Sequence, residues 1–200
     1  MPRVKIEGPE PRERIINAAR KLFFKHGYDP VSTDMIAKEA RVSKSTLYNQ
    51  VGDKKSVLIA FVHNENERFF DAKFTPPDNF KDYRQSLIDF GVNLLGLLSE
   101  KDLRRFDQVM LGQAMINPDI STSFYKEAYE LSFKHVANMI GFGQEKGYIK
   151  SKEDPAFLSE ILGHSMIGTP YHKAMYGFKK SYHEKPRERI EKILKIILGI

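Results

Sequence analysis

The sequence lacks cysteine and tryptophan and has no long apolar run. The lack of cysteine excludes disulfides, thiolate zinc sites and cysteine nucleophiles, and it is typical of proteins from reducing compartments. No apolar run approaches the roughly 20 residues that a membrane-spanning helix needs. Residues 1–10 carry charges and two prolines around no apolar segment, so they do not resemble a signal peptide. These absences predict a cytoplasmic protein without a membrane partner.

Enzyme motifs are also missing from the sequence. There is no glycine-rich phosphate loop, and no Ser/His/Asp set stands within a hydrolase motif. Glu160 and His164 stand four residues apart on one expected helix, but a metal site needs three or more converging ligands. We therefore expect no catalysis, no metal and no cofactor.

Positive charge is concentrated in the first third of the chain. The net charge is +6, and residues 1–60 hold 12 Lys and Arg against 7 Asp and Glu, whereas residues 61–200 hold 20 against 19. A basic N-terminal module is what a polyanion binder such as a DNA-binding domain needs. A basic surface without a partner gives the same count, so charge alone does not decide between them.

Apolar residues recur at helical spacing along the chain, and no segment shows the alternation and turn pairs of a β-hairpin. Ser, Thr, Asp, Asn and Pro stand where helices would begin, and Gly stands where several would end. The first expected helix spans residues 11–26, two short helices begin at Ser32-Thr33 and at Ser43, and a fourth runs from Asp53 to about Lys73. The next helix spans residues 80–98, and another follows the capping-box-like Ser99–Asp102. The last three run from Asn117-Pro118 towards Gly147, from Asp154-Pro155 to about Gly177, and over residues 186–198. The predicted fold class is all-α.

Two short helices with a tight connection near residues 33–50 are typical of a helix-turn-helix, whose second helix enters the major groove of DNA. Apolar residues would brace this unit from within, and the second helix presents side chains that form hydrogen bonds with phosphates and base edges. The bracing residues are Ile36, Ala37, Val42 and Leu47. We expect residues 1–62 to form a three-helix DNA-binding domain that includes the start of a connecting helix, and residues 63–200 to form a helical regulatory and dimerisation domain.

Residues 11–62 resemble the DNA-binding domain of the TetR (tetracycline-repressor) family. The matching positions are Ala18-Ala19, Leu22-Phe23, Gly27, Ile36-Ala37, Ala40, Val42-Ser43-Lys44, Thr46-Leu47-Tyr48 and Lys54. The chain departs from the family pattern at Gln50, where Tyr or His is frequent, at Val51, where a bulky aromatic is usual, and at Lys55, where Glu is frequent. The C-terminal part is similar to the family in helix order and length, with the AefR-like subgroup as one candidate.

The resemblance implies which residues contact DNA. Thr33, Tyr48 and Lys54 match positions that contact phosphate, Lys55 adds charge beside Lys54, and base contacts arise from the recognition helix. The expected DNA-binding residues are Thr33, Lys44, Ser45, Thr46, Tyr48, Asn49, Lys54 and Lys55. Tyr48 has an alternative role as a half-buried packing residue. For Lys54 and Lys55 the alternative is a solvated helix start, although a cation there opposes the helix dipole and needs another reason.

The last two expected helices carry apolar faces, and in the TetR family such helices pair with their symmetry mates in a four-helix bundle. The resemblance therefore implies a homodimer, and two-fold symmetry would match a palindromic operator. The expected interface residues are Phe157, Ile161, Ile167, Ile190, Ile193, Leu194 and Ile197. The alternative is that these residues only complete the core of their own chain, and both roles can hold in part.

The C-terminal domain also holds candidates for an effector pocket, which is mostly apolar with a few orienting polar groups. The candidate lining residues are Phe90, Leu94, Met110, Gln113, Phe124, Tyr125, Tyr129, His164 and Tyr171. At helical spacing, such aromatic and Met residues are more often plain core.

The sequence thus predicts a DNA-binding transcriptional regulator, and first of all a repressor whose affinity for its double-stranded operator changes when a largely apolar small molecule binds. The alternatives are a regulator without a small-molecule effector, or an activator. A cavity in the C-terminal domain would favour the effector.

Overall fold

The computed structural model describes residues 9–70, 75–178 and 184–200. Within these ranges every regular element is helical, which confirms the predicted fold class. No described helix combines the length and apolar character needed to cross a membrane. The interpretation of residues 1–8 and the expected end of the fourth helix at Lys73 lie outside the described residues.

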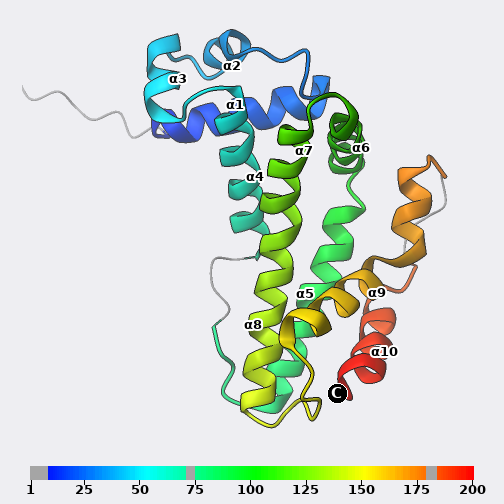
Figure 1. Ribbon diagram of the computed structural model, residues 1–200. Coiled ribbons are helices and arrows are strands. Elements are labelled where there is room, and N and C mark those ends of the chain that lie inside the picture. Colours follow the sequence, from blue (N-terminus) through cyan, green and yellow to red (C-terminus); the bar gives the residue numbers. More distant parts are fainter. Residues whose placement is uncertain (1–8, 71–74, 179–183) are drawn as a thin grey trace, which may run out of the picture.

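A head of three helices lies across one end of a bundle formed by the remaining helices (Figure 1). In chain order the helices are α1 (Pro11–His26), α2 (Thr33–Glu39), α3 (Lys44–Gln50), α4 (Lys54–Phe70), α5 (Phe80–Leu98), α6 (Lys101–Ile116), α7 (Pro118–Tyr125), the π-helical turn η1 (Lys126–Glu130), α8 (Leu131–Glu145), α9 (Pro155–Met175) and α10 (Pro186–Leu198). α1, α2 and α3 form the head, and α4 descends from it beside the α7–η1–α8 column (Figure 1).

The helices of the head begin where the sequence predicts. The Ser32 side chain accepts a hydrogen bond from the backbone N–H of Met35, and Ser43 accepts one from that of Thr46. Asp53 accepts from the N–H of Ser56 at the start of α4. Each bond satisfies an N–H that the first turn of a helix leaves without a partner. Local side-chain chemistry therefore fixes the frame of the helix-turn-helix.

The expected capping box at Ser99 is wrong. The Ser99 hydroxyl donates backwards to the carbonyl oxygen of Leu95 at 2.7 Å, so it belongs to the end of α5. α6 begins after Glu100 without a side-chain cap. A serine hydroxyl can bond either to the preceding turn or to the following one, and here the preceding turn holds it.

Two expected continuous helices are interrupted. The helix from Pro118 towards Gly147 contains the π-helical turn η1, a feature frequently found at functional sites. α9 breaks at Gly168, which has φ 57° and ψ −168° and is followed closely by Pro170. Arg189 of α10 donates to the carbonyl oxygens of Ser165 and Met166 at 2.5 and 3.2 Å. The guanidinium thereby satisfies carbonyl groups that the break leaves without helical partners.

The buried apolar residues form two clusters. The first fills the head and the upper part of α4, and it also contains Phe106 and Met110 of α6 and Phe124 of α7. The second joins α5, α8, α9 and α10 around the fully buried Leu87, Ile140 and Leu162. The head therefore shares its core with α6 and α7 and does not pack as an isolated unit.

Candidate DNA-binding surface and ligand cavity

The recognition helix α3 has one buried and one exposed face. Leu47 is fully buried in the first core cluster, whereas Lys44, Ser45, Tyr48 and Asn49 are exposed. The apolar side of α3 thus fixes the helix on the head, and its polar side faces away. This division is what a helix that reads a DNA groove requires.

The structure brings together two residues expected to contact phosphate. The hydroxyl groups of Thr33, at the start of α2, and of Tyr48, on α3, lie 3.5 Å apart. Tyr48 is 46% exposed. Two hydroxyl groups at one surface point form a small donor set of the kind that phosphate oxygens accept from.

Hydroxyl groups also cluster at the N-terminus of α3. The Ser43 hydroxyl lies 2.8 Å from that of Ser45 and 2.7 Å from that of Thr46. The Lys44 ammonium forms an exposed ion pair with Asp34 of α2 at 2.8 Å, and this bond raises the pKa of Lys44. An exposed ion pair exchanges readily with a phosphate, so the pair leaves Lys44 available to DNA.

Lys54 has a structural partner within the head. Its ammonium donates to the backbone carbonyl oxygen of Asp29 at 3.0 Å and lies 4.2 Å from the ring centroid of Tyr28. Burial lowers the pKa of Lys54. These contacts give a reason for a cation at the N-terminus of α4 that the sequence did not reveal, and the phosphate contact of Lys54 stays a prediction. Lys55, next to it, is half-buried.

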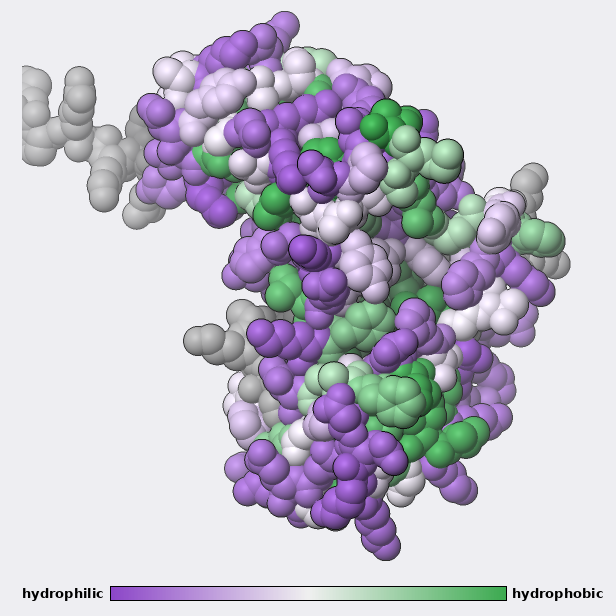
Figure 2. All heavy atoms as spheres, viewed as in Figure 1, coloured by the Kyte–Doolittle hydropathy of each residue, from purple (hydrophilic) through white to green (hydrophobic). Residues whose placement is uncertain are grey.

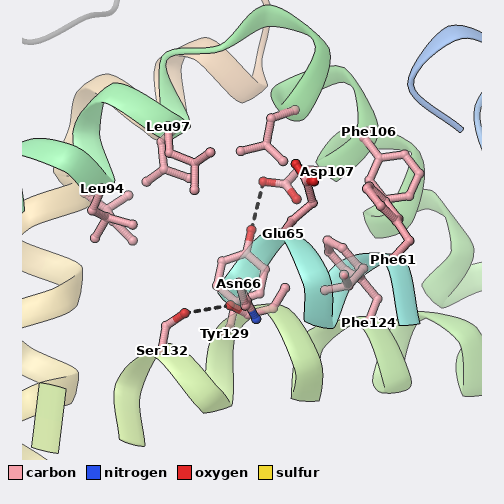
Figure 3. A pocket seen from close by; sticks show the side chains of 15 residues that line it. Phe61, Glu65, Asn66, Leu94, Leu97, Phe106, Asp107, Phe124, Tyr129 and Ser132 are labelled. Atoms are coloured by element: carbon pink, nitrogen blue, oxygen red, sulfur yellow. Dashed lines mark hydrogen bonds between the residues drawn. The ribbon is translucent and has the colours of Figure 1, made fainter. Parts of the chain in front are cut away.

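A cavity of about 80 Å³ lies below the head, between α4 and the bundle helices (Figure 3). Its wall is mostly apolar and aromatic with a few polar side chains, the composition of a ligand site. The lining residues are Phe61, Val62, Glu65, Asn66, Leu94, Leu97, Leu98, Leu103, Phe106, Asp107, Phe124, Ala128, Tyr129, Ser132 and Ile167. Ligand pockets are typically on the order of 300–1,000 Å³, so a ligand of drug size would have to widen this one.

A buried carboxyl group, Asp107, forms part of the cavity wall. It is 4% exposed and accepts hydrogen bonds from the hydroxyl of Tyr129 at 2.9 Å, as Figure 3 shows, and from that of Tyr171. Burial raises the pKa of Asp107, while the two tyrosine bonds act against the rise. Burial and the neighbouring carboxyl group in turn raise the pKa of both tyrosines. The cluster joins α6, η1 and α9.

A few of the residues expected to bind a ligand lie at this cavity, and their role in binding stays a prediction. Leu94, Phe124 and Tyr129 line it, and Tyr171 bonds to Asp107. The other candidates lie elsewhere. Met110 is fully buried in the first core cluster, and Gln113 is buried and donates a hydrogen bond to Asp29. Phe90 stacks on His135, Tyr125 is exposed and stacks on Tyr129, and His164 is exposed beside Phe133. These positions follow a helical repeat but face the cores or the surface instead of the cavity.

The residues expected at a dimer interface fall into distinct groups. Phe157 and Ile161 of α9 are exposed, and Ile193 and Ile197 of α10 are half-buried. Ile190 and Leu194 are fully buried in their own chain, as the alternative of an intrachain core role expects, and Ile167 lines the cavity. Apolar side chains gather on the near face of the molecule over α9 and α10 (Figure 2).

Sequence reasoning missed the polar residues of the cavity. Asp107 carries a signal, because it stands four residues after Leu103 and three before Met110, within the apolar stripe of α6. An acid at such a position is either paired or functional. Glu65 and Asn66 carry no comparable signal, since α4 is polar at its C-terminal end.

Comparison with known proteins finds relatives in sequence and in fold. The profile of the bacterial regulatory proteins of the tetR family matches residues 15–61. The transcriptional regulator UidR of Escherichia coli K12 is 26% identical over 166 residues, which are 81% of each chain. A TetR regulator from Agrobacterium tumefaciens superposes with a TM-score of 0.75 at 16% identity, over 94% of this chain and 95% of that one. SmeT of Stenotrophomonas maltophilia, in complex with triclosan, gives 0.68 at 19% identity, over 93% and 90%.

The head matches the family profile, its recognition helix is exposed as DNA reading requires, and the likeness in fold extends over nearly the whole chain. Residues 15–61 therefore form a DNA-binding domain of the tetR family type, and the chain is a DNA-binding transcriptional regulator.

Proposed function

We propose that this regulator is a repressor that binds a palindromic operator as a homodimer and is released when a small molecule occupies the cavity of Figure 3. One observation carries the proposal: α4 belongs both to the head and to the cavity wall. The N-terminus of α4 contacts the head through Lys54 and Asp29, and its middle carries Phe61, Glu65 and Asn66 into the cavity lining.

The small volume of the cavity would couple effector binding to the position of the DNA-binding head. Because its volume is about 80 Å³, an effector larger than a few atoms enters only if the surrounding helices move apart. α4 is fixed to the opposite wall by Asn66, whose amide donates to the carbonyl oxygen of Glu127 in η1. Widening that breaks this bond shifts α4 and the head with it. The effector then binds the displaced state better than the DNA-bound state, and the affinity for DNA falls.

Operator binding by a dimer rests on a second surface. Phe157 and Ile161 stand one helical turn apart on α9 and expose their side chains, and the half-buried Ile193 and Ile197 extend the apolar surface onto α10. Apolar surface of this kind is buried in homodimers. A two-fold axis there would present one head to each half-site, about 34–36 Å apart for one turn of DNA.

Other properties belong to the same proposal. The cavity favours regulation by an effector over regulation without one, and SmeT, a relative in fold, has been seen in complex with triclosan. A bacterial DNA-binding regulator works in the cytoplasm, and we assign this chain to it without an enzymatic activity. In this proposal, residues 1–62 form the DNA-binding domain and residues 63–200 form the regulatory and dimerisation domain. An activator differs from a repressor only in the effect of its bound operator on transcription.

The first experiment selects operator sequences from random DNA and measures affinity at fixed salt, together with molar mass in solution. Replacement of both Phe157 and Ile161 by Asp should produce folded monomers, because these exposed side chains contribute little to the intrachain core. Loss of the linked second head should lower operator affinity by orders of magnitude. The matched control replaces Leu111 and Met115 by Asp and should remain dimeric. These two residues are exposed and apolar and lie one turn apart on α6. A wild type that is monomeric and still binds a palindrome tightly would refute the dimer.

A further inference from the structure

The carboxyl group of Asp107 has one oxygen in use and one available. Both tyrosine hydroxyls, of Tyr129 and Tyr171, donate to Oδ2. Oδ1 accepts no hydrogen bond from any residue in the described part of the chain. Because Asp107 lines the cavity, this second oxygen can accept from a ligand there. Each carboxylate oxygen has lone pairs for about two hydrogen bonds, so the capacity is present.

The charges of the described residues that line the cavity are unbalanced. Among the described residues that line it, the ionisable carboxyl groups are those of Glu65 and Asp107, and none is Lys, Arg or His. Glu65 has a counter-ion, the guanidinium of Arg20, whose Nε lies 3.0 Å from its carboxylate. Asp107 takes part in none of the ion pairs found among the described residues. A buried carboxylate without a cation is unfavourable, and a positive ligand would relieve it.

Aromatic rings provide the rest of the wall. Phe61 and Phe106 pack edge to face at 5.7 Å between centroids, and Phe106 and Phe124 pack at the same distance. Tyr129 continues this group beside Asp107 (Figure 3). Ring faces attract cations and also accept flat apolar groups. The wall thus combines one uncompensated carboxyl group with surfaces suited to an aromatic or aliphatic body.

We infer that the effector is a lipophilic organic cation, a protonated amine on a compact apolar or aromatic body, whose N–H group binds Oδ1 of Asp107. The inference rests on the proposed role of the cavity as the effector site. Among the described lining residues, an anionic ligand would meet two carboxyl groups and no cation. A neutral alcohol or phenol can donate to Asp107 but leaves the buried charge uncompensated.

Three probes of nearly equal size separate these ligand classes: benzylamine, benzyl alcohol and benzoate. A cavity of about 150 Å³ holds benzene, so a single ring demands only limited widening here. Affinities are measured by ligand-observed NMR titration of the full-length protein in the absence of DNA. We expect benzylamine to bind about 10- to 100-fold more tightly than benzyl alcohol, the range for a hydrogen bond to a charged group, and benzoate to bind most weakly.

The variant Asp107→Asn keeps the shape of the side chain and an acceptor for the two tyrosines. It should reduce the preference for benzylamine over benzyl alcohol to near unity. The matched control Asp102→Asn removes the same charge from an exposed position on the same helix and should keep the preference. Should Asp107→Asn fail to fold, the ranking of the three probes on the wild type still decides the matter.

Several results would overturn the inference: equal or tighter binding of benzyl alcohol or benzoate, no binding by any probe, or an amine preference that survives Asp107→Asn. Operator release is measured separately by adding benzylamine to the protein–operator complex. Binding of the amine without release would contradict the proposed function and leave the ligand class in place. An operator complex released by a neutral or anionic compound instead would support the function and refute the amine.

Discussion

Lys54 has two proposed tasks, and the variant Lys54→Ala separates them. The ammonium carries three N–H donors, of which one bonds to the Asp29 carbonyl oxygen, while the charge also lies against the ring of Tyr28. A donor remains for a DNA phosphate. We therefore expect the variant to lose both folding stability and part of the electrostatic binding to DNA.

The stability loss follows from the contacts. A partly exposed cation–π contact contributes about 0.5–1 kcal/mol, and a hydrogen bond from a charged group contributes about 1.5–3 kcal/mol at most. Removing a cation from a helix N-terminus returns about 0.3–1 kcal/mol. The net expectation is a decrease of about 1–4 kcal/mol in the free energy of unfolding, measured by urea denaturation.

The DNA contribution is measured as the salt dependence of operator affinity. Each phosphate contact contributes about 0.9 to the slope of log K against log salt, so a dimer that loses two Lys54 contacts should lose about 1.8. Lys55→Ala is the matched control for stability alone, because Lys55 makes no side-chain hydrogen bond or ion pair among the described residues. Its loss should leave stability unchanged and, since Lys55 is itself an expected DNA-binding residue, lower the salt slope. Reduced stability with an unchanged salt slope would make Lys54 a structural cation and refute the phosphate contact.

Three further predictions concern the head, the cavity and α9. Asn49→Ala should change base preference at particular operator positions, at a cost of about 1–3 kcal/mol; selected-site logos identical to the wild type at lower affinity would place Asn49 on the backbone. Burial raises the pKa of Asp107, so the folded state binds the proton of this carboxyl group more tightly than the unfolded state does. The unfolding free energy of the wild type, relative to that of Asp107→Asn, should therefore fall as pH rises from 3.8, the ordinary pKa of an aspartate, through the raised pKa. A difference between the two proteins that does not depend on pH contradicts this. Gly168→Ala should destabilise by about 1–3 kcal/mol in urea unfolding, because φ is 57° and the added Cβ would clash with the guanidinium group of Arg189, whereas Gly96→Ala, on an open helix face, should not destabilise.

The sequence predicts the head well because local chemistry determines it. Ser32 and Ser43 cap the helices that they precede, and the apolar positions around Leu47 are buried at helical spacing. At Ser99 the same reasoning fails, because the hydroxyl group also has an acceptor within reach in the preceding turn, the carbonyl oxygen of Leu95. Local signals therefore suffice where one choice of partner exists.

The cavity depends on contacts that local patterns do not encode. The Asp107 cluster joins residues 22 and 64 positions apart along the chain. Its geometry further depends on the π-helical turn that places Tyr129 and on the break at Gly168 that precedes Tyr171. Ile190 and Leu194 show the same limit, since an apolar face on α10 does not reveal whether its own chain or a partner covers it.

The shared core of the head limits how this regulator can be recombined with others. Phe23 and Phe61 contact Phe106, at 6.2 and 5.7 Å between ring centroids, and Asp29 accepts a hydrogen bond from Gln113 of α6 at 2.6 Å. A chimera that joins residues 1–62 to another regulatory domain would keep the operator specificity but lose Phe106, the ring that completes the core of the head. A functional exchange of heads would have to redesign the facing surface of α6 and α7 at the same time, so that operator specificity and effector response are inherited together.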